Sequence, residues 1–159
     1  DRAFMVEVMG RKSGYLALIA GISSGAEATI IPEVEYDIEE IAANLFERYK
    51  AGKTNSLVIV AEGASSAHSI ERKLKNQIGY ETRISVLGHI QRGGGTTVFD
   101  RLLASKFGQN AVELLIEGEI GVATVLRENH YMSETLERVV SETKTLSPQL
   151  LDLAQKLAS

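Results

Sequence analysis

Residues 87–95, Leu-Gly-His-Ile-Gln-Arg-Gly-Gly-Gly, place several hydrogen-bond donors where an apolar, strand-like run ends. The guanidinium of Arg92 is a planar fork that matches the oxygens of a phosphate group. The imidazole of His89 can donate to the same kind of oxygen. Three consecutive glycines let the backbone pass close to a ligand. A flexible glycine loop is the alternative, but the density of donors favours a phosphate site.

Two other segments follow apolar runs and carry polar groups. Residues 9–14, Met-Gly-Arg-Lys-Ser-Gly, combine a glycine and two cations with the start of a helix, whose first N–H groups attract anions. A tight turn with solvated cations is an equally good interpretation. Glu62 stands between an apolar run and Gly63. Its carboxylate could accept hydrogen bonds from sugar hydroxyls, although a helix-capping or solvated carboxylate explains Glu62 alone more simply.

The elements that would position these residues alternate along the chain. The continuous apolar run at residues 57–60 is typical of a strand covered on both faces. Asp37, with the acidic Glu40 three residues later, predicts an N-cap, and Pro148 suits the first turn of a last helix. Strands are expected at residues 4–9, 29–31, 57–60, 81–87 and 122–126, and helices at 14–24, 38–51, 66–78, 98–116 and 148–156.

Strand–helix alternation of this kind predicts an α/β fold. We expect a Rossmann-like three-layer α/β/α sandwich with a mostly parallel sheet. Ligands of such sheets bind beyond the carboxyl ends of the strands. Arg11, Glu62, His89 and Arg92 are therefore expected to form one pocket for a phosphorylated polyol.

Composition excludes several other functions. The chain has 159 residues, 44% of them hydrophobic, which suits one compact domain. A net charge of −4, from 17 basic and 21 acidic residues, argues against a nucleic-acid surface. No apolar run approaches the roughly 20 residues of a membrane span, and no cysteine is present. We find no metal-ligand spacing, no Walker-type loop and no Ser-His-Asp arrangement, and we expect His68 and His130 to be surface residues. A cytoplasmic protein is expected.

Taken in order, these segments resemble the phosphofructokinase family over nearly the whole chain. Residues 87–94, Leu-Gly-His-Ile-Gln-Arg-Gly-Gly, are a highly specific motif of that family, and their spacing from Met-Gly-Arg strengthens the match. A strand begins within the first few residues, so we expect the chain to be cut from a longer protein, and the resemblance implies that it is the carboxy-terminal half. The matching segments are Met9-Gly10-Arg11, Pro32-Glu33, Glu62, residues 87–94 and Asp100-Arg101.

The resemblance implies a role for each matching residue. Met9 and Gly10 would line the fructose 6-phosphate pocket, and Arg11 would face the transferring phosphoryl group as a catalytic residue. Glu62 would bind fructose hydroxyls, and His89 and Arg92 would contact the fructose 6-phosphate. Two further arginines, Arg2 and Arg83, would reach into the pocket of a neighbouring subunit to hold the 6-phosphate there.

A second, tentative site is implied between subunits. Gly25, Glu27 and Lys53 match positions that bind nucleotide or phosphoenolpyruvate effectors. Ala51 and Thr54 depart from basic residues common there, which suggests weakened or lost effector binding. The run at residues 93–97, Gly-Gly-Gly-Thr-Thr, also departs from the commoner continuation Gly-Gly-Ser-Pro. Thr stands where Pro is common, which is expected to change loop stiffness.

The implied activity is that of an ATP-dependent 6-phosphofructokinase of glycolysis, a homotetramer that uses Mg²⁺ with ATP and forms fructose 1,6-bisphosphate. Residues 1–91 would be the sugar-phosphate domain, residues 92–145 would pack towards the nucleotide half, and residues 146–159 would hold the last helix. The catalytic base and the nucleotide loop would lie outside this chain, so it should be inactive alone. A pyrophosphate-dependent enzyme and a non-catalytic sugar-phosphate sensor remain alternatives.

Overall fold

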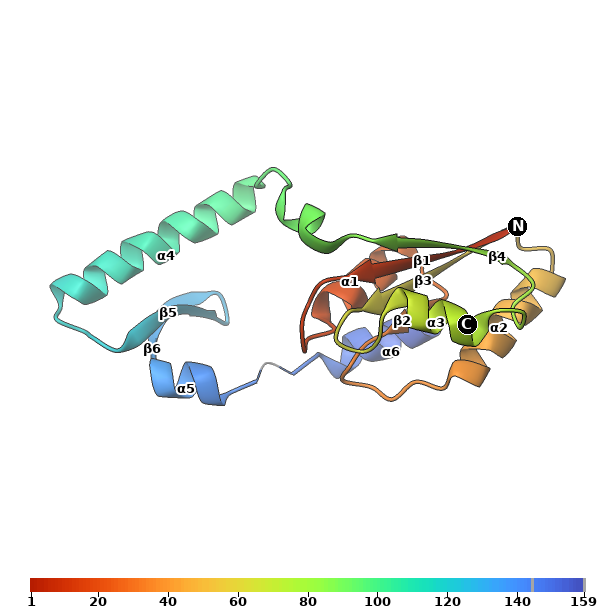
Figure 1. Cartoon of the computed structure of the whole chain (residues 1–159). Coiled ribbons are helices and arrows are strands. Elements are labelled where there is room, and N and C mark those ends of the chain that lie inside the picture. Colours follow the sequence, from red (N-terminus) through yellow and green to blue (C-terminus); the bar gives the residue numbers. More distant parts are fainter. Residues whose placement is uncertain (144, 159) are drawn as a thin grey trace. The chain divides into compact units, whose positions relative to one another are not determined.

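The structure, a computed structural model, describes residues 1–143 and 145–158. They form two compact units, which are considered separately (Figure 1). Unit 1 contains residues 1–93 and the described residues from 146 onward, and unit 2 contains the described residues of 94–145. In this described part of the chain, no helix is long and apolar enough to cross a membrane.

Unit 1 is built on a four-stranded parallel sheet in the order β2-β3-β1-β4. β1 lies between β3 and β4, so the chain ends of these three strands emerge side by side. The strands are β1 (Arg2–Val8), β2 (Ala28–Ile30), β3 (Asn55–Ala61) and β4 (Glu81–Val86).

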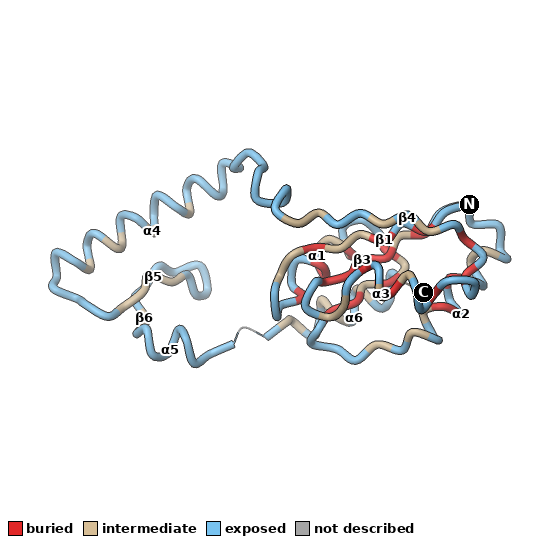
Figure 2. Tube along the Cα trace, viewed as in Figure 1, coloured by how far each residue is buried: buried red, intermediate tan, exposed pale blue. Residues whose placement is uncertain are grey.

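Helices cover both faces of this sheet. α2 (Ile38–Lys50) and α3 (Ala67–Leu74) pack on one face, where Met5 and Val58 are fully buried. α1 (Tyr15–Ser24) and α6 (Pro148–Ala158) lie on the other face. Figure 2 shows the buried residues concentrated in these layers. The predicted α/β/α sandwich with a parallel sheet is confirmed.

One predicted helix is shorter than expected. The sequence suggested a helix over 66–78, but α3 ends at Leu74. Asn76 and Gly79 both have positive φ angles, 67° and 73°, and Ile78 turns into the core, where it is 1% exposed. A Cβ on Gly79 would lie 2.5 Å from the ring of Tyr49. The chain therefore leaves the helix early because burying Ile78 in a tight turn favours a non-helical path.

Glu7, the one charged residue in the first predicted strand, has a structural partner. Its Oε2 accepts a hydrogen bond from the backbone N–H of Ala67 at 2.8 Å. Ala67 is the first residue of α3, where N–H groups lack partners within the helix. The carboxylate thus ties the central strand to the start of the helix packed on it.

Unit 2 combines a long helix with a hairpin. The expected helix over 98–116 is confirmed as α4 (Val98–Ile116), and Thr97 and Asp100 form a capping box at its start. β5 (Val122–Arg127) pairs antiparallel with β6 (His130–Thr135), and α5 (Leu136–Ser141) follows. The rings of Phe107 and Tyr131 meet edge to face, with centroids 5.5 Å apart, and join helix to hairpin.

The sequence predicted β5 but not β6 or α5. No strand was expected over residues 130–135, which form the second strand of the hairpin. Glu128 and Asn129 have φ angles of 48° and 66°, as a two-residue turn requires. Asn favours that conformation, but Glu does not, so the turn signal was weak.

Candidate functional site

The carboxyl ends of β1, β3 and β4 carry the residues that the sequence singled out. Val8 at the end of β1 pairs with Ala61 at the end of β3, and Glu7 pairs with Val86 at the end of β4. Adjacent strand ends therefore lead into the loop at residues 9–14, into Glu62, and into the 3₁₀ helix η1 (Gly88–Arg92). The structure brings Met9, Gly10, Arg11, Glu62, His89 and Arg92 to one edge of the sheet.

Glu62 binds the loop after β1 directly. Its Oε1 accepts the backbone N–H of Arg11 at 2.8 Å and that of Gly10 at 3.0 Å. These two N–H groups, Arg11 first, hold the pKa of Glu62 below its ordinary value. The charges of Arg11 and Arg92 act in the same direction, while the loss of hydration around the carboxylate opposes them. Glu62 is therefore an ionised carboxylate placed among positive groups.

The loop approaches the end of β3 so closely that only glycine fits beneath it. A Cβ on Gly63 would lie 1.8 Å from the backbone oxygen of Arg11. Arg11 itself has a φ of 50°, which is uncommon for a residue with a side chain. The hydrogen bonds to Glu62 stabilise this conformation and fix the direction in which the Arg11 side chain leaves the loop.

Gln91 connects η1 to the same loop. Its Oε1 accepts the backbone N–H of Met9 at 2.8 Å. Gln91 lies between His89 and Arg92 in the sequence, so this bond joins the segment carrying those two cationic or donor side chains to the end of β1. Sequence reasoning did not single out Gln91, because an amide beside two phosphate-binding candidates gave no separate signal.

The start of α1 is less available to an anion than the sequence suggested. The backbone N–H of Gly14 points at the carboxylate of Glu33, with N–O distances of 2.8 and 3.0 Å. The expectation of a free helix N-terminus is therefore wrong at Gly14, because a carboxylate from the loop after β2 already occupies it. At this edge, the side chains of Arg11, His89 and Arg92 are therefore the candidates for anion binding. The sequence alone gave no signal for this contact between Glu33 and Gly14.

The donor side chains at this edge are exposed. Among residues 1–143 and 145–158, no hydrogen bond or ion pair within the chain engages the side chains of Arg11, His89 or Arg92. Three donors without protein acceptors stand beside one carboxylate that is already ionised. This combination suits a ligand that carries both phosphate oxygens and hydroxyl groups.

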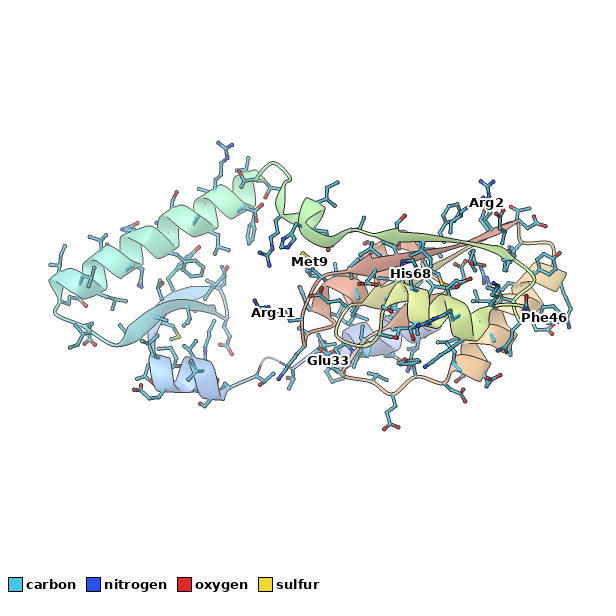
Figure 3. All side chains as sticks on the ribbon, viewed as in Figure 1. Arg2, Met9, Arg11, Glu33, Phe46 and His68 are labelled. Carbon is cyan, nitrogen blue, oxygen red and sulfur yellow. The ribbon has the colours of Figure 1, made fainter. Side chains whose placement is uncertain are left out.

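Arg2 and Arg83 lie away from this edge. Arg2 begins β1, and in Figure 3 it lies at the opposite end of the sheet from Met9 and Arg11. Arg83 lies in the middle of β4. Both side chains approach the carboxylate of Glu81, with N–O distances of 3.7 Å for Arg2 and 2.7 Å for Arg83. Neither arginine belongs to the strand-end cluster of its own chain.

Gly25, Glu27 and Lys53 gather near the amino ends of the strands. Gly25 ends α1 with a φ of 67°. Glu27 is half-buried and already has partners, because Arg48 donates to Oε1 at 2.8 Å and the backbone N–H of Leu57 donates to Oε2 at 2.6 Å. The backbone oxygen of Lys53 accepts from the Tyr80 hydroxyl. These residues form a group distinct from the Glu62 edge.

The two histidines outside the candidate site are exposed, as expected. His68 lies on α3, and His130 begins β6. Within the described residues, no group of three or more histidine and carboxylate side chains could hold a metal ion.

Comparison with known proteins places the whole chain in one family. Residues 1–115 match the family model described as Phosphofructokinase. The ATP-dependent 6-phosphofructokinase of Thermotoga neapolitana is 48% identical over 158 residues, which are 99% of this chain and 50% of that protein. The enzyme of the same name from Halalkalibacterium halodurans is 41% identical over the same shares. The chain thus spans about half the length of these curated relatives.

Solved structures agree with this assignment. Phosphofructokinase from Pichia pastoris in the T-state superposes with a TM-score of 0.80 and 34% identity, over 99% of this chain and 18% of that one. A pyrophosphate-dependent phosphofructokinase from Marinobacter aquaeolei, 20% identical, shares the fold with a TM-score of 0.78, over 99% of this chain and 48% of that one. The sequence motifs, the fold and the family match all agree, and the chain belongs to the phosphofructokinase family.

Proposed function

We propose that this chain is the carboxy-terminal, fructose 6-phosphate-binding half of an ATP-dependent 6-phosphofructokinase. The observation that carries this proposal is the meeting of Arg11, Glu62, His89 and Arg92 at one sheet edge, with the three cationic or donor side chains free of protein acceptors. The names of the curated relatives, 41% to 48% identical, support ATP as the phosphoryl donor.

In the proposed site, His89 and Arg92 bind the 6-phosphate. Arg92 is suited to this because its guanidinium can donate two parallel hydrogen bonds to phosphate oxygens. Glu62 uses Oε1 to hold the loop, so its second oxygen is available to a sugar hydroxyl. Met9 and Gly10 line the pocket beside it.

Arg11 takes the catalytic role. Arg11 has an unusual backbone conformation, and this conformation sets the direction of its side chain. The loop is held in place by the hydrogen bonds to Gln91 and Glu62. A guanidinium held there would neutralise charge that develops on the transferring phosphoryl group, which is the main protein contribution in phosphoryl transfer. The sugar 1-hydroxyl would be the acceptor.

Mg²⁺ and ATP would be bound mainly by a nucleotide-binding half, which would also supply the catalytic base. The term "assembled enzyme" is used below for this chain combined with that half. The chain alone would carry residues for binding fructose 6-phosphate but would not catalyse phosphoryl transfer. The division into a sugar-phosphate region at 1–91, a region facing the nucleotide half at 92–145 and a last helix at 146–159 stays a prediction, as does a glycolytic, cytoplasmic setting.

We also propose that Arg2 and Arg83 complete the pocket of a neighbouring subunit in a homotetramer. Both lie outside their own chain's cluster, and both are about half exposed. Glu81 holds them near the edge strand β4, from which a second copy could be reached. Gly25, Glu27 and Lys53 would belong to an effector site. The partners already bound to Glu27 are consistent with weakened effector binding.

Coupled assays on the assembled enzyme test this function. Arg92→Met should raise the KM for fructose 6-phosphate about ten- to hundred-fold, the range expected when hydrogen bonds to a charged group are lost. Arg72→Met, which removes an exposed cation on α3, is the matched control and should leave KM unchanged. Equal KM values for both variants would contradict the assignment of Arg92.

Two alternatives are decided by companion measurements. Turnover with pyrophosphate but not with ATP would assign the enzyme to the pyrophosphate-dependent class. Tight, saturable binding of fructose 6-phosphate by the chain alone as a monomer would favour a sensor and would argue against a pocket completed by Arg2 and Arg83.

A further inference from the structure

The segment that carries His89 and Arg92 has little apolar anchoring. Ile90, the large apolar residue of η1, is 75% exposed. The backbone N–H of Ile90 donates to the oxygen of Leu87, and that of Gly93 donates to the oxygen of Ile90. Both hydrogen bonds lie within η1 and the residues next to it. A short 3₁₀ helix of this kind is not rigid by itself, because its hydrogen bonds have poorer geometry than those of an α-helix.

One side chain links η1 to the rest of unit 1. In the described residues, the bond from Met9 N–H to Oε1 of Gln91 is the only hydrogen bond by which an η1 side chain reaches another element. The donor is a backbone group at the end of the central strand, so the bond also fixes which way the amide of Gln91 faces. The backbone nitrogen of Met9 thereby lies 2.8 Å from Oε1 of Gln91, at the edge where the cationic side chains gather.

Several backbone N–H groups of the loop at residues 9–14 donate to side-chain oxygens of other segments. Backbone N–H groups of the loop are taken by Gln91 at Met9, by Glu62 at Gly10 and Arg11, and by Glu33 at Gly14. Three different segments thus hold one loop through side-chain oxygens. Glu62 and Glu33 fix the loop to the ends of β3 and β2, whereas Gln91 is the member that transmits this position to η1.

We propose that Gln91 is a positioning residue that couples the phosphate-binding segment at 88–92 to the Arg11 loop, a role that rests on the proposed function above. The neutral amide accepts the Met9 N–H without adding negative charge beside His89 and Arg92. A carboxylate at this position would accept the same bond but would attract the two phosphate-binding side chains itself. Gln91 therefore sets the spacing between the two parts of the pocket and does not touch the ligand.

The direct test is hydrogen–deuterium exchange resolved to single amides in the assembled enzyme. Gln91→Met keeps the side-chain length but removes the oxygen acceptor, and the Met9 amide should then exchange about five-fold faster or more, as the loss of one hydrogen bond predicts. Gln91→Glu retains an acceptor and should keep Met9 protected. Gln155→Met on α6 is the matched control and should leave Met9 exchange unchanged.

Kinetics separate positioning from simple structural support. Gln91→Met should raise the KM for fructose 6-phosphate about five-fold, with kcat within about two-fold and the melting temperature unchanged. Unchanged Met9 exchange in Gln91→Met would overturn the proposal. A raised KM without faster Met9 exchange would also overturn it, because Gln91 would then contact the ligand. If Arg92→Met leaves KM unchanged, the proposed function fails, while Met9 exchange still decides whether Gln91 holds the loop.

Discussion

The backbone nitrogen of Arg11 lies 2.8 Å from Oε1 of Glu62, and this contact gives the carboxylate a task within its own chain. Glu62 was expected to bind sugar hydroxyls, and that role stays a prediction. In the structure it also stabilises the strained loop that presents Arg11. One side chain can serve both purposes, because a carboxylate accepts several hydrogen bonds at once.

Two substitutions of Glu62 should separate these tasks. Glu62→Gln keeps an oxygen acceptor for the loop but loses the charge, so the assembled enzyme should lose about ten-fold in kcat/KM. Glu62→Leu removes every acceptor and should lose at least a further ten-fold, because the Arg11 loop is released as well. Steady-state kinetics check both values. Equal losses for the two variants would show that the loop contact contributes nothing to activity.

The loop contact should persist in acid. Because N–H donors lower the folded-state pKa of Glu62 below 4.5, ionised Glu62 stabilises the fold at pH values above its unfolded pKa. That contribution is lost only as the pH falls through the lower, folded pKa. Amide chemical shifts of Gly10 and Arg11, followed by NMR, should titrate with a midpoint below pH 4.5. Glu62→Gln should abolish this transition, and a midpoint above 4.5 would contradict the assigned hydrogen bonds.

Gly63 should tolerate no side chain. An alanine Cβ would lie 1.8 Å from the Arg11 oxygen, so Gly63→Ala must displace the loop. We expect a loss of about 1–3 kcal/mol in the free energy of unfolding, the usual range for overpacking, together with a large fall in activity. Chemical denaturation measures the first quantity.

Gly108→Ala is the control for this prediction. No atom lies within 4 Å of a Cβ built on Gly108, which is in the middle of α4. Alanine should therefore stabilise the helix by about 0.5–1 kcal/mol. Destabilisation by Gly108→Ala equal to that of Gly63→Ala would show that close approach is not the reason for glycine at position 63.

The sequence predicted the fold well where apolar runs were long. The apolar run at residues 57–60 is typical of a covered strand, and α4 follows a long helical pattern with a strong cap. The sequence-based prediction was wrong or incomplete where a local sequence signal and tertiary packing favoured different structures. Ile78 continues the helical pattern of α3 but is buried by a turn, and Glu128 is an unusual residue for the hairpin turn before β6.

The candidate site shows the same division. Residues that offer charge at strand ends, such as Arg11 and Arg92, could be identified because the sheet topology brings those ends together. Gln91 and Glu33 could not, because their importance depends on which backbone N–H groups they meet in space. The free helix N-terminus expected near Gly14 was wrong for the same reason.

Unit 2 carries an apolar surface on α4 that the described residues do not cover. Val98, Leu102, Val112 and Ile116 are 76%, 61%, 56% and 80% exposed and fall on one side of a helix. Phe107 contacts Tyr131 of β6 instead. A helix that is apolar on two sides is normally buried on both, and Figure 2 shows most of α4 exposed.

The chain alone should therefore self-associate. Sedimentation velocity should show concentration-dependent association, and Leu102→Gln with Ile116→Gln should reduce it. Val140→Gln removes an equally exposed apolar side chain from α5 and should change association much less. A strictly monomeric profile for the unsubstituted chain would contradict the prediction that this side of α4 needs a covering partner.

Under the proposed function, this chain supplies the fructose 6-phosphate side of a phosphofructokinase and needs a nucleotide-binding half to act. The most direct measurement is a coupled assay of fructose 1,6-bisphosphate formation with Mg-ATP and fructose 6-phosphate, for this chain alone and for the assembled enzyme. We predict no turnover by the chain alone and turnover by the assembled enzyme that Arg11→Met abolishes. Turnover by the chain alone, or full activity of the Arg11→Met enzyme, would contradict the proposed function.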